Sequence, residues 1–171
     1  MAIIESKVYN LEIGELIIEP ANSNEAEEII SFIKQVEKET DFLIRQAGEF
    51  SMSVEEEKNL IERKRESHKD LFLTAKVNGK IVGTLGFLGN SYSRYSHKGQ
   101  FGIALLKDYW NKGIGTKMIE VLLDWTDKNG FVKITLEVDS NNERAIHLYE
   151  KFGFKQEGIL KMDKYMGNGV Y

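Results

Sequence analysis

The sequence predicts a mixed α/β fold in which helices cover the faces of one central sheet. Short runs rich in β-branched residues alternate with longer segments whose apolar residues recur at helical spacing. Between two of these runs lies Asn78-Gly79, a pair that tolerates positive φ and predicts a tight hairpin. In chain order the elements read β-α-α-β-β-β-α-β-α-β, a pattern typical of a sheet with helices packed on it.

Composition is consistent with one globular domain over residues 1–171, with a 42% hydrophobic and a 29% charged fraction. The chain has no cysteine, which excludes disulfides and zinc–thiolate sites and is compatible with a cytoplasmic location. There is no pattern of a secretory signal and no apolar run long enough to span a membrane. The net charge is −4 without a basic stripe, so we expect neither a membrane nor a nucleic acid as partner.

The first strand and the first helix are expected on either side of Pro20. Glu15 to Glu19 is a short strand that ends at this proline, which lacks a backbone donor. Ser23 or Asn24 is expected to cap the following helix. The apolar face of that helix is formed by Ala26, Ile29, Ile30, Ile33 and Val36.

A second helix is predicted to begin at Ser53, which forms a capping box with Glu56. The segment between the two helices, Thr40 to Met52, has little periodicity and is expected to be a loop with buried anchors or a mobile flap. The acidic run Glu55–Glu57 is interpreted as a solvated helix face with a capping role, which would also attract a polyamine.

Three strands follow in the middle of the chain. Leu71–Val77 and Lys80–Leu88 are the arms of the predicted hairpin. After a polar loop over Gly89–Gly99, the residues Gln100–Leu105 form a further strand.

The next helix is predicted over Gly113–Lys128 and ends at Asn129-Gly130. The β-branched run Val132–Val138 predicts a strand, and Asn142–Phe152 predicts the last helix, which ends at Gly153.

The C-terminal segment is expected to return to the sheet. A strand from Phe154 through Met166 leads to a hairpin turn at Gly167–Gly169, but the return arm would stop at Tyr171. We therefore expect a sheet edge that is ragged or intermolecular, with a possible homodimer through this edge or the C-terminus.

Two glycines at a helix start, Gly113 and Gly115, indicate a phosphate site. The first turn of a helix presents unpaired N–H groups and a partial positive charge, and Lys112 lies beside it. The alternative is that both glycines only permit close helix–sheet packing. Neither a P-loop nor a dinucleotide-binding fingerprint fits, since the lysine follows Thr116 in the wrong order and Met118 stands where a third glycine belongs.

Two motifs together resemble the GNAT superfamily of N-acetyltransferases. Trp110 to Gly115 is similar to the family's coenzyme A pyrophosphate loop, Gln/Arg-x-x-Gly-x-Gly/Ala. Asn142 to Phe154 matches the second signature, Asn-x-x-Ala-x-x-Leu-Tyr-x-x-x-Gly-Phe. The resemblance implies a mixed, mostly antiparallel central sheet with helices on both faces, a splayed central strand pair, and a cofactor-binding core over about 97–155. Trp110 departs from the usual Gln or Arg.

The resemblance also implies a set of residues that contact acetyl-coenzyme A, the acetyl donor. The strand residues near Leu105 would part from the neighbouring strand and receive the pantetheine arm, and a backbone N–H near Leu105 would polarise the thioester. The residues implied are Ile103, Ala104, Leu105, Trp110, Asn111, Lys112, Gly113, Ile114, Gly115, Thr116, Asn142 and Tyr149.

Acyl transfer to an amine also needs groups that move protons. Tyr149 matches the family tyrosine that acts as general acid, although its spacing alone is that of a core residue. Asn142 is in addition an expected N-cap. His97 and Glu137 are alternative general bases. No metal is expected, because His68 and His147 read as surface positions.

The resulting hypothesis is an N-acetyltransferase that acts by direct attack of a primary amine. The acceptor is a small-molecule amine or a protein N-terminus, and its identity is expected to depend on the loops 40–52 and 89–99. The alternative from another class is a non-catalytic acyl-coenzyme A binding or sensing domain on the same scaffold.

Overall fold

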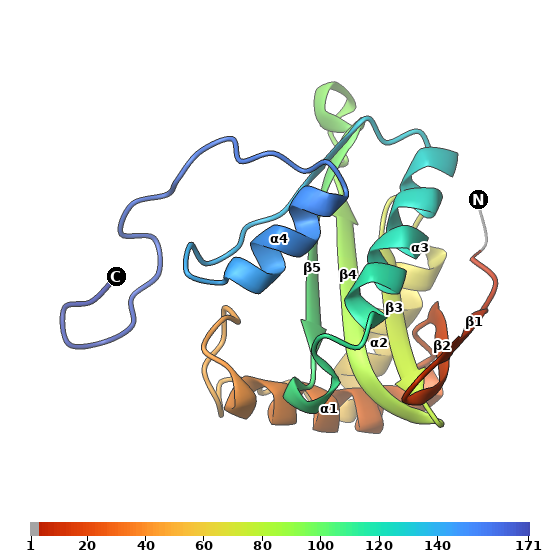
Figure 1. The fold of residues 1–171 in the computed structure, drawn as a ribbon. Helices are drawn as coiled ribbons and strands as arrows, with labels where there is room; N and C mark the ends of the chain where they lie inside the picture. The colour runs from red at the N-terminus through yellow and green to blue at the C-terminus, as the bar shows by residue number, and fades with distance from the viewer. Residues whose placement is uncertain (1–3) are drawn as a thin grey trace. The chain divides into compact units, whose positions relative to one another are not determined.

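The computed structural model describes residues 4–171, which form two compact units, residues 4–137 and residues 138–171. The first unit contains the sheet and three of the α-helices, and the second contains the last helix, α4 (Figure 1). The expectation of one domain over residues 1–171 stays a prediction.

In the described part of the chain the sheet has six strands in the order β1-β2-β3-β4-β5-β6. All neighbours are antiparallel except β5 and β6, which are parallel, so the predicted mixed, mostly antiparallel sheet is confirmed. The strands are β1 (Lys7–Leu11), β2 (Gly14–Pro20), β3 (Leu71–Val77), β4 (Lys80–Gly89), β5 (Lys98–Leu105) and β6 (Lys133–Thr135).

Strand β1 was not predicted from the sequence. Its five residues are exposed or half-buried and include a lysine and an asparagine, so they carry no clear alternation. The strand exists because it pairs with β2, with Lys7 opposite Ile18 and Leu11 opposite Gly14.

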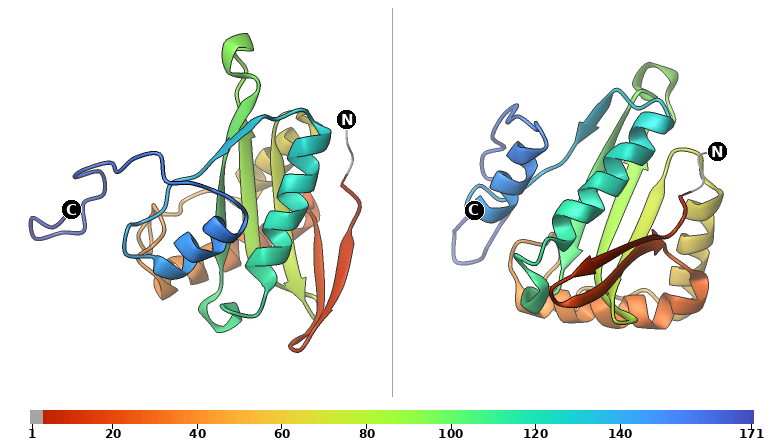
Figure 2. Two further views of the ribbon diagram at one scale, coloured as in Figure 1. Left: turned by 45° about the horizontal axis from the view of Figure 1, so that its top comes forward. Right: turned by 45° about the vertical axis from the view of Figure 1, so that its right-hand side comes forward.

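Helices cover both faces of the sheet in the first unit, as Figures 1 and 2 show. On one face, α1 (Ala26–Glu39) and α2 (Val54–Glu66) enclose a buried cluster. That cluster contains Ala21, Ala26, Ile29, Phe32, Val36, Ile61, Ile81 and Leu106. On the other face lies α3 (Ile114–Lys128), whose Trp125 meets Phe87 of β4 edge to face at 5.6 Å.

Strand β4 serves both layers because its side chains alternate. Phe87 packs against α3, whereas Thr84 and Gly86 lie on the side of α1 and α2. The predicted turn that leads into β4 is confirmed, with φ of 49° at Asn78 and 83° at Gly79.

The predicted cap of the first helix is wrong. Ser23–Glu25 form a short 3₁₀ turn, and the Oδ1 atom of Asn22 accepts a hydrogen bond from the Asn24 N–H at 3.0 Å. Asn22 therefore caps the 3₁₀ turn, and α1 begins at Ala26 with Glu25 as its N-cap and no side-chain cap hydrogen bond. The capping box at Ser53 and Glu56 is confirmed.

The strand predicted over 132–138 is shorter than expected, because β6 holds only Lys133–Thr135. Within residues 4–137, β6 pairs with β5 only from Lys98 to Gln100. The remainder of β5, through Leu105, therefore has a free edge on that side. This is the splayed strand pair that the resemblance implied.

In the second unit, α4 (Glu143–Lys151) is confirmed, but the strand expected from Phe154 through Met166 is not present among the described residues. A strand needs a neighbouring strand for its backbone groups, and the bridge described within this unit lies at the turn that ends the segment. There the Met166 N–H donates to the Val170 carbonyl at 2.8 Å, so the predicted Gly167–Gly169 turn is confirmed. The ragged or intermolecular edge stays a prediction.

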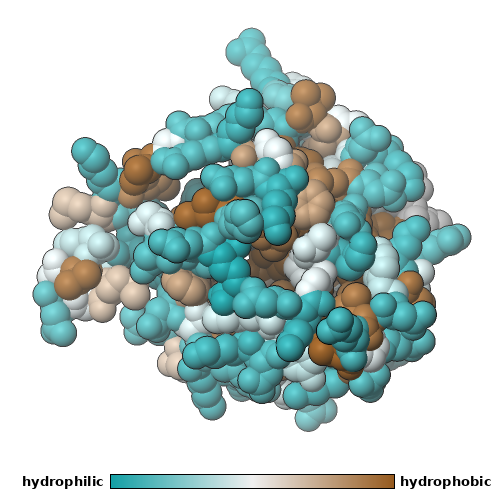
Figure 3. All heavy atoms as spheres, in the orientation of Figure 1, coloured by the Kyte–Doolittle hydropathy of each residue, from teal (hydrophilic) through white to brown (hydrophobic). Residues whose placement is uncertain are grey.

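Hydrophilic residues make up most of the face shown in Figure 3, as expected for the charged fraction of 29%. In the described residues, every helix is too short or too polar to cross a bilayer.

The capping box gives a test of this local structure. The Ser53 Oγ atom accepts from the Glu56 N–H at 3.3 Å. We expect Ser53→Ala to lower the free energy of unfolding by about 1 kcal/mol, because a first-turn donor loses its partner. Urea denaturation measures the change. Ser51→Ala, at an exposed site just before the helix, is the control; equal losses in both variants would contradict the capping role.

Candidate active site

The strand β5 leads into a tight connection that positions the first turn of α3. After Leu105 the chain makes a 3₁₀ turn at Lys107–Tyr109 and reaches α3 through residues 110–113. The backbone takes positive φ at Asn111 (59°) and at Gly113 (82°). A hydrogen bond of 2.7 Å from the Lys107 N–H to a carboxylate oxygen of Glu39 ties this connection to the end of α1.

The N-terminus of α3 is suited to bind an anion. Its N-cap residue is Gly113, and no side chain caps the first turn. The exposed residues Asn111, Lys112 and Gly113 surround it, while Ile114 and Gly115 are buried and Thr116 is half-buried. Because the helix dipole and free N–H groups point outward here, the geometry fits the predicted phosphate site.

The structure distinguishes the two explanations for Gly113. A Cβ built at this position would meet no atom within 4 Å, so close packing does not require glycine. The φ of 82° does, because L-residues with a side chain rarely adopt it.

The free edge of β5 exposes backbone groups next to this helix start. The Leu106 N–H donates to the Val82 carbonyl of β4 at 3.0 Å, so residue 106 faces β4. Backbone groups alternate along a strand, so the N–H and carbonyl of Leu105 face the free edge, as do those of Ile103. Ala104 directs its backbone groups toward β4.

Trp110 has a structural role at this edge. Its indole Nε1–H donates to the Leu105 carbonyl at 2.9 Å. The carbonyl of Leu105 is thereby satisfied. The N–H of Leu105 points to the same edge and is the group that could contact a ligand there. The indole thus links the end of β5 to the loop in front of α3.

The two base candidates lie at different levels of the strand pair. His97 is exposed and precedes β5, and its carbonyl accepts from the Val132 N–H at 2.8 Å. At about 3.3 Å per residue it lies roughly 26 Å from Leu105, so the structure does not bring these two residues together. Glu137 is also exposed, and it follows β6 by two residues on the diverging chain. Extending the parallel register from Gln100–Thr135 places it level with Gly102.

Two further predicted residues belong to the second unit. Asn142 is the N-cap of α4, as expected, since its Oδ1 atom accepts from the Ala145 N–H at 3.3 Å. Tyr149 is half-buried and meets the Phe154 ring edge to face at 6.0 Å. Burial raises the pKa of Tyr149 to about 12, so its hydroxyl stays protonated at neutral pH.

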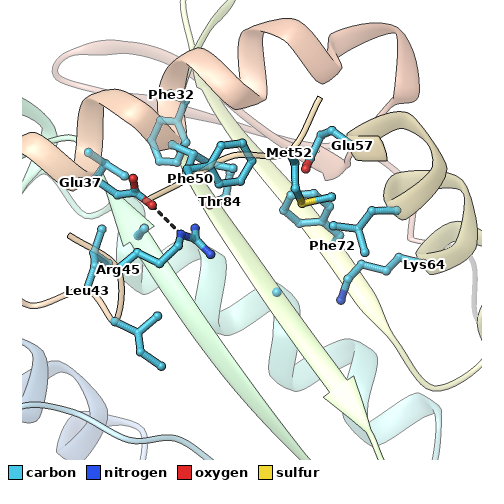
Figure 4. A pocket seen from close by; sticks show the side chains of 16 residues that line it. Phe32, Glu37, Leu43, Arg45, Phe50, Met52, Glu57, Lys64, Phe72 and Thr84 are labelled. Carbon is cyan, nitrogen blue, oxygen red and sulfur yellow. Dashed lines mark hydrogen bonds and ion pairs between the residues drawn. The ribbon is translucent and has the colours of Figure 1, made fainter. Parts of the chain in front are cut away.

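A pocket of about 280 Å³ lies on the sheet face covered by α1 and α2 (Figure 4). Sequence reasoning did not find it. The loop over residues 40–53 closes one side, β3 and β4 form the floor, and Ala104 of β5 reaches the wall. The pocket therefore adjoins the strand whose edge is free at Leu105. Its apolar lining includes Phe32, Phe50, Phe72 and Met52.

Four charged side chains line this pocket: Glu37, Arg45, Glu57 and Lys64. Arg45 donates from Nε to Glu37 Oε1 at 2.6 Å and lies over the Phe50 ring. Figure 4 shows this pair on the α1 side and Glu57 beside Met52 on the α2 side. Glu57 is 1% exposed, and its Oε1 atom has no hydrogen-bond partner among residues 4–171.

The interpretation of Glu55–Glu57 as a solvated helix face is wrong for Glu57, which is buried. Glu55 and Glu56 are exposed, as expected. A signal was available in the sequence. Glu57 is spaced three and four residues from Leu60 and Ile61, so it shares their helix face. Desolvation raises the pKa of Glu57, although the charges of Arg45 and Lys64 partly oppose this shift.

The uncapped helix start and the free strand edge together are suited to an extended, phosphate-bearing ligand on an α/β domain. Residues 33–154 match the acetyltransferase (GNAT) family, and the chain belongs to this family of acyltransferases, which use acetyl-coenzyme A.

Several solved structures share this fold. An acetyltransferase of the GNAT family from Streptococcus pneumoniae superimposes with a TM-score of 0.85 and 31% identity, over 88% of this chain and 91% of that one. A putative acetyltransferase from Salmonella typhimurium, solved with its cofactor acetyl-CoA, has a TM-score of 0.69 and 17% identity, over 85% of this chain and 86% of that one. At 17% identity the likeness shows the fold alone.

Curated relatives match over shorter regions. A probable N-acetyltransferase, camello, from Xenopus tropicalis is 31% identical over 54% of this chain and 42% of its own length. The spermidine N(1)-acetyltransferase of Escherichia coli is 37% identical over 43% of this chain and 40% of its own length. The chain thus matches less than half the length of either relative.

The first unit fits the family's co-substrate. The uncapped start of α3, with Lys112 beside it, would hold the pyrophosphate, and the free edge of β5 at Ile103 and Leu105 would hold the pantetheine arm. Among residues 4–171, no group of three side chains is arranged to bind a metal ion.

Two glycines at opposite ends of α3 give a matched test of the anion site. Gly113 and Gly130 both have positive φ, of 82° and 75°, and open space where a Cβ would lie. We expect either glycine-to-alanine change to lower the free energy of unfolding by about 1 kcal/mol. Only Gly113→Ala should also weaken coenzyme A binding, by about tenfold in calorimetry. Equal affinity in both variants would contradict the site.

Proposed function

We propose that this chain transfers an acetyl group from acetyl-coenzyme A to a primary amine by direct attack. The observation that carries the proposal is the free edge of β5 next to the uncapped start of α3. Membership in the GNAT family and the names of the curated relatives support it. When bound, acetyl-coenzyme A supplies an activated acetyl thioester, and the chain's own groups position it and move protons.

The backbone of Leu105 is proposed to stabilise the charge that develops on the acetyl oxygen. Its N–H lies on the free edge, since the carbonyl of the same residue accepts from Trp110 there at 2.9 Å. A backbone donor that is fixed before the reaction begins loses no energy in reorganisation, and removal of one such donor typically costs about 3 kcal/mol of transition-state stabilisation.

The attacking amine must be neutral. A lysine-like amine has a pKa of about 10.4, so deprotonation at pH 7 costs about 4.6 kcal/mol and a base is useful. Of the two candidates, the strand register supports Glu137 over His97, because Glu137 is level with Gly102 while His97 lies at the far end of β5.

Tyr149 is proposed to assist the leaving sulfur as a hydrogen-bond donor. With a pKa of about 12, its hydroxyl is protonated at every pH at which the enzyme would work. A thiol has a pKa of about 8.5, so full transfer of the phenol proton to the thiolate is uphill. The hydroxyl therefore stabilises the sulfur by donation, and the proton that the thiol finally gains comes from solvent.

The other candidate, a non-catalytic acyl-coenzyme A binding domain, needs the anion site and the free edge but neither Tyr149 nor an acceptor pocket. A pocket of about 280 Å³ beside β5 favours the enzyme, because a binding domain has no use for it.

The enzyme is tested with a panel of primary amines and acetyl-coenzyme A, following free thiol. We expect amine-dependent thiol release, and a fall in kcat of about tenfold or more for Tyr149→Phe with little change in coenzyme A affinity. Tyr92→Phe, at an exposed tyrosine, serves as control. Coenzyme A binding without thiol release for any amine would favour the binding domain.

The base is tested in the same assay. Glu137→Gln should lower kcat/KM at pH 7. The reduction relative to the unmodified protein should be smaller at pH 10, where more of the amine is already neutral. His97→Gln should leave the pH–rate profile unchanged. The reverse result would reassign the base to His97.

A further inference from the structure

We propose that the pocket between α1, α2 and β4 binds the acceptor, and that the acceptor is a monocationic primary amine on an apolar body whose ammonium is received by Glu57. This inference rests on the proposed function and narrows its acceptor class.

Glu57 is a buried acid in the wall of this pocket. Its carboxylate is 1% exposed, lines the pocket, and has an oxygen without a hydrogen-bond partner among the described residues. An unpaired buried carboxylate is unfavourable in a folded protein. An ammonium in the pocket would supply both the missing donor and the opposite charge.

The carboxylates of the pocket differ in how far their charge is compensated. Glu37 is paired through Oε1 with Arg45 at 2.6 Å, although its Oε2 atom, like Oε1 of Glu57, has no hydrogen-bond partner among the described residues. The charge of Glu37 is therefore compensated by Arg45, and Glu57 is the carboxylate whose charge is open to a ligand. Lys64 lines the same pocket, and desolvation lowers its pKa. A second or third ammonium would meet Arg45 or Lys64, and the one further carboxylate in the lining, Glu37, already has its charge compensated by Arg45. The lining therefore disfavours polyamines, in contrast to the relative that is named for spermidine.

The pocket is small and its lining is largely apolar. A volume of about 280 Å³ corresponds to that of about nine water molecules, and so to an acceptor of similar heavy-atom count. Phe32, Phe50 and Phe72 contribute aromatic surface, which favours an aryl or alkyl body over a polar one.

The pocket lies next to β5. Ala104 reaches its wall, and the next residue is Leu105, whose N–H faces the free edge. An amine held on the α1 and α2 face is thus adjacent to the strand that would hold the acetyl group. Glu57 binds the ammonium form, and the nitrogen leaves this carboxylate as a neutral amine, after its proton passes to the proposed base Glu137, before it attacks the thioester at the edge of β5. The face of β5 receives the acceptor, and the edge of β5 receives the donor.

The experiment compares phenethylamine with spermidine at saturating acetyl-coenzyme A. We expect kcat/KM for phenethylamine to exceed that for spermidine by at least about tenfold. Glu57→Gln should raise KM for phenethylamine by about tenfold to a hundredfold, as for loss of a charged hydrogen bond, with coenzyme A affinity unchanged. Glu55→Gln makes the same charge change at an exposed site of the same helix and should leave both substrates unaffected.

A second variant tests the charge argument separately. Lys64→Met removes a cation from the pocket and should raise kcat/KM for spermidine relative to phenethylamine by about tenfold. Circular dichroism checks that each variant is folded. Preference for spermidine or for a peptide N-terminus in the unmodified protein, or a Glu57→Gln variant that behaves like Glu55→Gln, would overturn the inference while acetyl transfer itself stands.

Failure of the proposed function has a different signature, since no amine would then release thiol. Calorimetry with phenethylamine in the presence of coenzyme A tests the pocket in that case. Binding that is weakened by Glu57→Gln and not by Glu55→Gln would support the pocket as an amine site, and absence of binding would overturn it.

Discussion

The parting of β5 from β6 after Gln100 is the constraint on which the rest of the site depends. Backbone N–H and carbonyl groups need partners, and a strand with one free edge leaves every second residue to find one elsewhere. In the first unit the Leu105 carbonyl finds the Trp110 indole at 2.9 Å. This contact links the free edge to the loop that begins α3, so the two parts of the donor site are positioned by one residue.

Strand alternation would then separate the proposed donor site from the proposed acceptor pocket. Along β5, the backbone of Leu105 faces the free edge while Ala104 reaches the pocket on the α1 and α2 face. Along β4, Phe87 packs on α3 while Thr84 and Gly86 line the pocket. One pair of strands thus supports the core under α3, the floor of the pocket and the free edge.

The parts of the fold that sequence reasoning predicted are those fixed by local interactions. The Ser53 capping box, the Asn78-Gly79 turn and the helix over 114–128 depend on residues close in the chain. Strand β1 and the short length of β6 depend on pairing with distant residues, which a single sequence does not reveal. The missing strand after Phe154 has the same cause, because a strand-like run forms a strand only with a partner.

In the candidate site, too, the part built from residues close in the chain was predictable, and the part built from distant residues was not. The anion site was predictable, since two glycines and a helix start lie within a few residues of one another. The pocket was not, because its lining comes from two helices, a loop and three strands. Glu57 illustrates the difference. Its helix face could be read from the sequence, but the sequence does not reveal that the nearby Arg45 is paired with Glu37 instead.

The free energy of folding gives a reason why an unpaired Glu57 points to a ligand. Burial raises the pKa of this carboxyl above its usual value of 4.5, so the folded chain binds a proton more tightly than the unfolded chain. The unfolding free energy therefore falls as the pH rises from about 4.5 through the raised pKa, and above that pH the ionised carboxylate opposes folding. A ligand whose ammonium pairs with Glu57 binds only the folded state and offsets this loss. The residue that makes the pocket unfavourable for the protein alone is thus the one that makes it favourable for a cationic acceptor.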